Sequence, residues 1–331
     1  MKIKDIGEQG LLTILQRFCP AEIVGDDAAV IAVPADRSLV ITTDMLVDRV
    51  HFSDRTTGPY YAGWRAAAAN LSDLAAMGAT PLAVTVALAV SADTAVDWVE
   101  EFYRGMTACL EVYHTPIVGG DVVRSPVVTV AITAFGQVEC DRTICRSNAR
   151  SNWAIVATGV HGASRAGLEL LLNPEFGLNL EKGDRTSLIL AHQRPKPRLD
   201  VLPVVWEILD AAGEFSIAGM DSSDGLADAI VQVCRASGVG AKVDRTKIPI
   251  PYSLSEIVST EKALDWALYG GEDFELVLFL PIARAKLLVD RIGDGAAIVG
   301  ITTESKDILL SDSSGICPDV GLKIDRGFQH F

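Results

Sequence analysis

Residues 215–230 read FSIAGMDSSDGLADAI and join an apolar run to a helical pattern through an acidic turn. The first part, up to Met220, has the composition of a buried strand, and an amphipathic helix is expected from Leu226 onward. Between them, residues 221–225 (DSSDG) place two acids and two hydroxyls in one turn. One acid is enough to cap a helix, so the second acid and the serines indicate a functional site.

The same combination, an acid beside glycine, serine or threonine where an apolar run stops, recurs along the chain. It occurs in GDDAAVI (25–31), LVITTDM (39–45), NLSDLAAMG (70–78), PIVGGD (116–121) and YGGEDFEL (269–276). A buried carboxylate costs several kcal/mol unless a metal ion or another partner compensates its charge. Clusters of oxygen ligands suit Mg²⁺, which commonly completes its coordination with substrate phosphates. The sequence therefore predicts phosphate chemistry.

Each of these segments also has a structural explanation when it is taken alone. Asp is a favoured turn residue, a Gly-Gly step makes a tight turn, and Ser or Asp caps helices. Asp73 lies in an otherwise apolar helix, and His51 in DRVHF is equally well explained as a structural histidine. The functional interpretation depends on the whole set of segments.

Composition limits the classes of partner and the compartment. The 331 residues carry a formal net charge of −14, whereas nucleic acids and anionic membranes are bound mainly through Lys and Arg clusters. No apolar stretch reaches the ~18 residues that span a bilayer, and the first residues lack the apolar core of a signal peptide. The six cysteines form no C-x-x-C pair. We expect a cytoplasmic protein with reduced thiols and neither a nucleic-acid nor a membrane partner.

Strand and helix patterns alternate in both halves of the chain. The first half predicts a helix over 61–77, a short strand at 117–119 and a β-branched strand over 127–135. The polar run RSNARSN (146–152) precedes a new strand. We therefore predict domains 1–145 and 146–331, which agrees with a typical domain size of about 150 residues. Because both halves carry acids, a site in the cleft between the two domains is expected.

Taken in order, seven segments resemble the thiamine-monophosphate kinase family over the whole chain. They are GDDAAVI, TTDMLVDRVHF, NLSDLAAMGATP, GGDVVRSP, RSNAR, MDSSDGLADAI and YGGEDFELV. This family belongs to the superfamily of aminoimidazole ribonucleotide synthetase, hydrogenase-maturation factor E and selenophosphate synthetase. Residues 44–52 and the ending GFQHF favour the thiamine branch. The selenophosphate and hydrogenase branches are disfavoured because Cys19 is the only cysteine near the first acidic segment and no cysteine ends the chain.

The resemblance implies an α+β fold of two mixed α/β domains, with the amino-terminal sheets paired in a homodimer. It implies ATP-dependent phosphorylation of thiamine monophosphate to thiamine diphosphate by direct in-line transfer, with no obligatory side-chain base. The implied ligands of several Mg²⁺ ions are Asp27, Thr42, Thr43, Asp44, Asp73, Asp121, Asp221 and Asp224. The implied contacts of ATP are Tyr103, Gly120, Arg146 and Ser223. The implied contacts of the thiamine compound are His51, Glu272 and Phe328.

Three positions depart from the family pattern. Ser222 replaces the usual Ile, Val122-Val123 replaces two threonines, and the loop after Arg146 lacks the usual proline and glycine. Two alternatives stay open at this point: another ATP-using enzyme of the superfamily, and a Mg-nucleotide-binding protein without catalytic activity.

Overall fold

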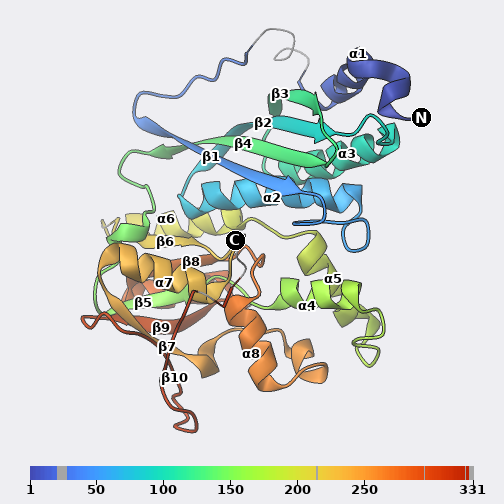
Figure 1. Ribbon diagram of the computed structural model, residues 1–331. Coiled ribbons are helices and arrows are strands. Elements are labelled where there is room, and N and C mark those ends of the chain that lie inside the picture. Colours follow the sequence, from blue (N-terminus) through green and yellow to red (C-terminus); the bar gives the residue numbers. More distant parts are fainter. Residues whose placement is uncertain (21–27, 214, 294, 325, 328–331) are drawn as a thin grey trace. The chain divides into compact units, whose positions relative to one another are not determined.

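The structure is a computed structural model that describes residues 1–20, 28–213, 215–293, 295–324 and 326–327 (Figure 1). Contacts divide the chain into two compact units. Unit 1 comprises residues 1–74 and 79–140, and unit 2 comprises residues 75–78 and 141–331. Both units combine helices with one sheet, so the predicted α+β class is confirmed.

Unit 1 contains a four-stranded sheet in the order β1-β4-β2-β3. Its elements are α1 (Ile3–Leu15), η1 (Gln16–Phe18), β1 (Arg37–Val47), α2 (Pro59–Ala76), β2 (Thr80–Val90), α3 (Val96–Val112), β3 (Ile117–Arg124) and β4 (Thr129–Glu139). Helices α2 and α3 lie on the same face of the sheet (Figure 1). Along β4, buried and partly exposed residues alternate strictly, as expected for a strand with one covered face.

Both edge strands of this sheet carry a predicted metal ligand inside the strand rather than after it. The short strand expected at 117–119 continues to Arg124, because Val122 and Val123 pair with β2. Asp121 therefore lies opposite Ala87 within the ladder, and Asp44 lies opposite Ile132 on β1. The sequence places these acids where an apolar run stops, but at Asp44 and Asp121 the strand continues past the acid.

Unit 2 contains a mixed seven-stranded sheet in the order β11-β10-β7-β9-β5-β8-β6. Its strands are β5 (Trp153–Ala157), β6 (Ala218–Asp221), β7 (Gly240–Asp244), β8 (Leu276–Pro281), β9 (Ala297–Thr303), β10 (Ile308–Ser311) and β11 (Val320–Gly321). Its α-helices are α4 (Ala163–Leu172), α5 (Lys182–Gln193), α6 (Leu202–Asp210), α7 (Leu226–Ser237), α8 (Thr260–Tyr269) and α9 (Ile282–Ile292). Its 3₁₀ turns are η2 (Arg146–Asn148), η3 (Arg198–Val201), η4 (Arg245–Lys247) and η5 (Tyr252–Glu256).

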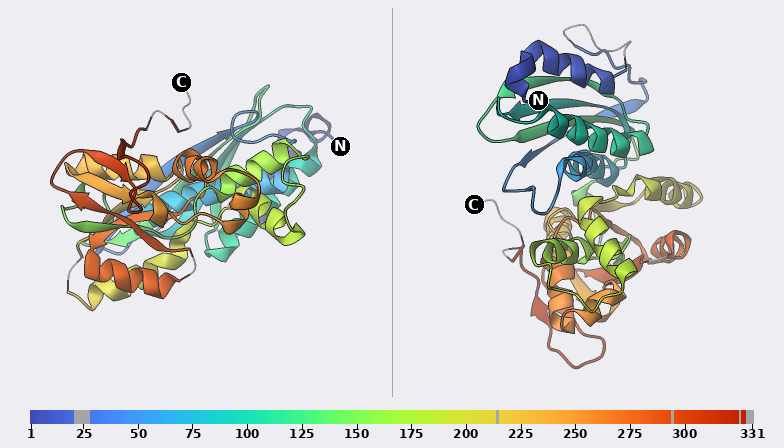
Figure 2. Two further views of the ribbon diagram at one scale, coloured as in Figure 1. Left: turned by 90° about the horizontal axis from the view of Figure 1, so that it is seen from below. Right: turned by 90° about the vertical axis from the view of Figure 1, so that its right-hand side faces the viewer.

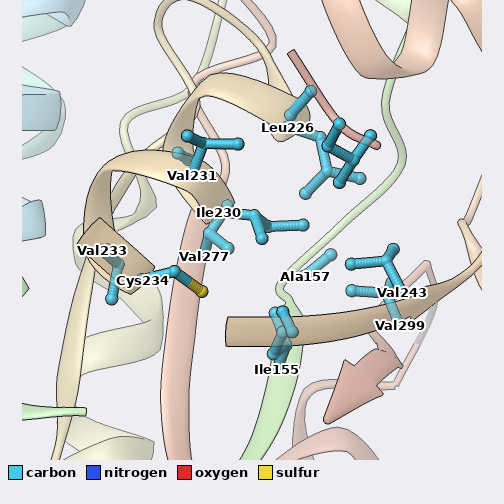
Figure 3. Close-up of a cluster of buried hydrophobic side chains, with 14 of the residues drawn as sticks. Ile155, Ala157, Leu226, Ile230, Val231, Val233, Cys234, Val243, Val277 and Val299 are labelled. Carbon is cyan, nitrogen blue, oxygen red and sulfur yellow. The ribbon is translucent and has the colours of Figure 1, made fainter. Parts of the chain in front are cut away.

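Helix α7 packs on one face of the larger sheet, and α6 and α9 pack on the other (Figure 2). The apolar side of α7, including Leu226 and Ile230, meets Val243, Val277 and Val299 from the sheet (Figure 3). Because Leu226 opens α7 and is fully buried, this packing fixes where the helix begins. The preceding acidic turn is therefore tied to a rigid core.

Two helices were not expected from the sequence, α1 and α5. In α1, Gly7 has a left-handed φ of 67° and kinks the helix, and the kink interrupts the helical periodicity of the apolar residues. Helix α5 begins with the polar run KGDRTS. Among the described residues, no helix has the length and apolarity needed to cross a membrane.

Candidate active site

In unit 1, two side chains of helix α2 form hydrogen bonds with two predicted metal ligands on strand β1, Thr42 and Asp44. The hydroxyl of Thr42 donates a hydrogen bond to the carboxylate of Asp73. One turn earlier on α2, the side-chain oxygen of Asn70 accepts a hydrogen bond from the backbone N–H of Asp44, at 3.1 Å. Thr42, Asp44 and Asp73 are thus brought together, whereas Thr43 points to the other face of the sheet and bonds to Thr133.

Sequence reasoning missed Asn70. Its side chain is fully buried, and its amide nitrogen also donates to the carbonyl of Ala66 at 3.0 Å. Asn70 and Asp73 are three residues apart, so they share one face of α2. An amide and an acid three residues apart in an alanine-rich helix were the sequence signal that could have predicted a polar contact of this helix.

Tyr103, Gly120 and Asp121 line a cavity of about 570 Å³ in unit 1. Residues of α1, β2, α3 and β3 contribute most of the wall, together with residues of the segment 28–33. Tyr103 is buried, and this burial raises the pKa of its hydroxyl, which therefore stays protonated. The cavity is large enough for a small-molecule ligand and combines apolar walls with a carboxylate at β3.

Gly120 is required by the sheet itself. A Cβ at this position would lie 2.1 Å from the carbonyl oxygen of Val86, whereas a Cβ on Gly119 would find its nearest neighbour at 3.8 Å. Gly120→Ala should therefore lower the free energy of unfolding by about 1–3 kcal/mol, because the two strands must separate locally. The matched variant Gly119→Ala should change it by less than about 0.5 kcal/mol. Urea unfolding tests this, and equal effects of the two variants would contradict it.

In unit 2, the acidic turn and the YGGEDFEL segment lie against each other. The hydroxyl of Ser223 donates to the Asp221 carboxylate at 3.1 Å, and the N–H of Glu272 donates to the carbonyl of Ser223 at 2.7 Å. Gly271 makes the approach possible, since a Cβ there would lie 2.9 Å from the Ser223 oxygen. Asp221, the last residue of β6, is buried as predicted for a strand end.

Glu272 adopts a left-handed backbone conformation with φ of 60°, and Phe274 does so with φ of 52°. Such conformations cost of order 1 kcal/mol or more in residues other than glycine and cluster at functional sites. The Glu272 carboxylate is about one third exposed and lies 3.7 Å from Nδ1 of His192. The backbone strain is consistent with a functional role for Glu272.

Two further predicted residues are held by local hydrogen bonds. The Arg146 guanidinium donates to the side-chain oxygen of Gln232 on α7 at 2.6 Å. His51 lies just after β1, and its Nδ1 accepts a hydrogen bond from the N–H of Val47 at 3.0 Å. The structure therefore places Arg146 beside α7 and His51 beside the end of β1.

The chain is similar to known proteins over almost its whole length. Residues 25–138 match the family described as AIR synthase related protein, N-terminal domain. The thiamine-monophosphate kinase of Synechococcus elongatus is 48% identical over 99% of this chain and 98% of that protein. The chain belongs to the thiamine-monophosphate kinase family. The resemblance inferred from the sequence is therefore confirmed, and the chain is a phosphotransferase by membership of this family.

Two other members of the thiamine-monophosphate kinase family extend the comparison. The Escherichia coli K12 protein is 33% identical and covers 93% of this chain and 91% of its own length. The solved structure of AaThiL complexed with AMPPCP and TMP is 29% identical, with a TM-score of 0.72, and covers 94% of this chain and 95% of that one. The fold thus matches a family member that binds an ATP analogue and TMP.

The metal ligands predicted for this chain are of the kind that magnesium prefers. Thr42, Asp44, Asp73 and Asp121 offer only oxygen donors, as do Asp221 and Asp224 in unit 2. Within the described ranges, no three His, Cys, Asp or Glu side chains form a metal-binding group on their own. Two of the predicted site residues, Asp27 and Phe328, lie outside the described residues.

The acid next to Glu272, Asp273, is partly buried. Burial raises the pKa of Asp273 to about 7, although the N–H groups of Gly162 and Ser164 donate to its two carboxylate oxygens at 2.7 and 2.9 Å and favour the ionised form. These two amides belong to the start of α4. The carboxylate therefore links the YGGEDFEL segment to that helix.

The raised pKa makes the contribution of Asp273 to stability depend on pH. The folded protein retains a proton that the unfolded chain releases near its usual pKa of 3.8. This stabilisation is fully present below that value and is lost as the pH rises through about 7. The stability of the wild type relative to Asp273→Asn should fall by about 2–3 kcal/mol between about pH 5 and about pH 8. Urea unfolding at several pH values measures this difference, and a constant difference would contradict the prediction.

Proposed function

We propose that this chain transfers the γ-phosphoryl group of ATP to thiamine monophosphate, giving thiamine diphosphate and ADP, by direct in-line transfer without a phosphoenzyme. The observation that carries the proposal is the end-to-end similarity to AaThiL, whose complex holds AMPPCP and TMP. The hydroxyl and carboxylate contacts of β1, α2 and the acidic turn support it, because phosphoryl transfer requires mainly positioning and charge stabilisation.

The proposed roles of the residues follow the sequence prediction. The proposed Mg²⁺ ligands are Asp27, Thr42, Asp44, Asp73, Asp121, Asp221 and Asp224, together with Thr43, whose hydroxyl bonds to Thr133 on the other face of the sheet in this structure. Bound magnesium would neutralise the phosphates and stabilise the charge of the transferred group. In unit 1, Thr42 bonds to the Asp73 carboxylate and Asn70 bonds to the backbone N–H of Asp44, and these contacts hold Asp73 and Asp44 in place. No side-chain base is needed, because a phosphate monoester is already ionised near neutral pH, with a second pKa of about 6.

The remaining roles concern the two substrates. We propose that ATP contacts Tyr103, Gly120, Arg146 and Ser223, and the cavity lined by Tyr103 and Gly120 supports the first two assignments. The thiamine compound would contact His51, Glu272 and Phe328. The partly exposed carboxylate of Glu272 can offset the positive charge of the thiazolium ring.

We also propose a homodimer in which the sheets of unit 1 pair. The face of this sheet opposite α2 and α3 exposes Leu39, Ile41 and Met45 on β1, with exposed fractions of 46%, 57% and 55%. Adjacent apolar side chains on an open sheet face are typical of a surface that another subunit covers. Sedimentation equilibrium of the purified chain tests the proposal, and a monomer at micromolar concentration would overturn it.

The test of the activity is direct. Purified protein incubated with ATP, Mg²⁺ and thiamine monophosphate should yield thiamine diphosphate and ADP in equal amounts. Activity on an aminoimidazole precursor in place of thiamine monophosphate would show another enzyme of the superfamily. ATP binding without transfer to either acceptor would show a nucleotide-binding protein without turnover.

A further inference from the structure

Ser222, in the middle of the acidic turn, is fully buried while the residues around it carry the proposed chemistry. Its backbone N–H donates to the carbonyl of Glu275 at 2.8 Å, and the N–H of Glu275 donates to its hydroxyl at 3.1 Å. Its own carbonyl accepts a hydrogen bond from the N–H of Gly225 at 3.0 Å. Ser222 therefore links the acidic turn to the residue that precedes β8. The hydrogen bond between its carbonyl and Gly225 also closes the turn.

The Ser222 hydroxyl has a second partner, Nε2 of His161 at 3.1 Å. The other ring nitrogen of His161, Nδ1, lies 3.1 Å from the carbonyl oxygen of Gly159. A carbonyl can only accept, so Nδ1 carries the proton. Nε2 of the neutral ring then accepts, and the Ser222 hydroxyl donates to it, which leaves the serine oxygen free to accept from Glu275.

His161 is equally well fixed. Its ring is fully buried, and its backbone N–H donates to the carbonyl of Pro249 at 2.8 Å. Burial lowers the pKa of His161 to about 4, so the ring stays neutral near neutral pH and the hydrogen-bond directions are constant there. Ser222 thus connects the acidic turn to a rigid, uncharged anchor between β5 and α4.

We propose that Ser222 and His161 are positioning residues, whose buried hydrogen bond fixes the turn that presents Asp221, Ser223 and Asp224 to the magnesium and nucleotide. This inference rests on the proposed function of that turn. Neither residue is among the proposed contacts of magnesium, ATP or the thiamine compound. Their effect passes through the backbone of the turn. In metal sites generally, residues that hydrogen-bond to the ligands hold those ligands in position.

An apolar residue at position 222 would fill the space but would leave two polar groups without a partner. These are the N–H of Glu275 and Nε2 of His161. Each buried polar group that loses its partner costs about 1–3 kcal/mol. The turn could relieve this cost only by moving, and its acids would move with it.

The decisive variant is Ser222→Ala, with Thr302→Val as its matched control. The Thr302 hydroxyl is also fully buried in unit 2, accepts from the N–H of Trp153 at 2.8 Å and donates to the carbonyl of Arg150 at 2.6 Å. Both variants remove one buried hydroxyl that accepts once and donates, so both should lose similar stability. Only Ser222 is attached to the acidic turn.

Calorimetry of AMPPCP binding across a Mg²⁺ titration provides a readout that needs no turnover. Ser222→Ala should raise the Mg²⁺ concentration for half-maximal binding about tenfold or more, and Thr302→Val should leave it unchanged. Amide hydrogen exchange of a peptide covering residues 220–230 should be faster in Ser222→Ala alone. Ser222→Cys keeps a weak donor of similar volume, so it should show an intermediate shift and replaces the alanine variant if that variant does not fold.

The outcomes separate this inference from the proposed function. Unchanged Mg²⁺ dependence and exchange in Ser222→Ala, or equal shifts in Thr302→Val, overturn the positioning role. A wild type that binds AMPPCP with Mg²⁺ but never phosphorylates thiamine monophosphate overturns the proposed function. In that case the shift in Mg²⁺ dependence still decides whether Ser222 and His161 position the turn.

Discussion

Arg198→Leu should lower the free energy of unfolding by about 3–5 kcal/mol, because it leaves a largely buried carboxylate without its counter-charge. The Arg198 guanidinium donates to the Glu275 carboxylate and to the carbonyl of Thr158, at 2.9 Å for the latter. Both charged side chains of the pair are only 14% exposed. Burial raises the pKa of Glu275 even with Arg198 present, so removal of the cation should raise that pKa further.

Two comparisons isolate the charge as the cause. Arg291→Ala breaks an ion pair with Glu207 whose side chains are 51% and 65% exposed, so it should cost at most about 1 kcal/mol. The double variant Arg198→Leu with Glu275→Gln removes the unpaired charge and should recover part of the lost stability. Urea unfolding of the four proteins measures these differences. A double variant as unstable as Arg198→Leu would show that lost packing, not charge, is responsible.

The sequence predicted the acidic turn of unit 2 well, because its information is local. An apolar run, two acids and an amphipathic helix follow one another, and the structure has β6, the turn and α7 in that order. The strand ends at Asp221 because Met220 is the last apolar residue that the sheet can bury. Such a pattern needs no knowledge of distant residues.

The acids of unit 1 show where local reasoning fails. Asp44 and Asp121 lie inside strands, and these strands are at the edges of the sheet. An edge strand has a side that is not hydrogen-bonded to a neighbouring strand, so a polar side chain there can meet solvent, a helix or a ligand. Which strand lies at an edge depends on the order of the whole sheet, and the sequence alone does not give that order.

The buried polar contacts also could not be predicted from the sequence. Asn70 bonds to Asp44, which is 26 residues away in the sequence, and His161 bonds to Ser222, which is 61 residues away. Each of these residues, taken alone, is an ordinary polar residue in an apolar surrounding. Their importance follows from the partner that the fold places beside them, because a buried polar group must be hydrogen-bonded.

Asp44→Asn and Asp224→Asn test the proposed catalytic chemistry in the two units separately. Each change keeps the size of the side chain but removes a negative charge that would bind magnesium. Because such a metal contributes several kcal/mol to stabilisation of the transferred group, kcat/KM for ATP should fall by at least about 100-fold in each variant. Rates of thiamine diphosphate formation at saturating Mg²⁺ measure the loss.

The fold should survive both changes, because asparagine keeps the size of each side chain and the Asn70 contact of Asp44 uses the backbone N–H. Unfolding free energies should therefore stay within about 1 kcal/mol of the wild type. Asp290→Asn, an exposed acid on α9, provides the matched control and should change neither rate nor stability. If one of the two variants keeps a near-normal rate, the proposed metal role of that acid is wrong. If both do, catalysis does not depend on the carboxylates from which the magnesium site was inferred.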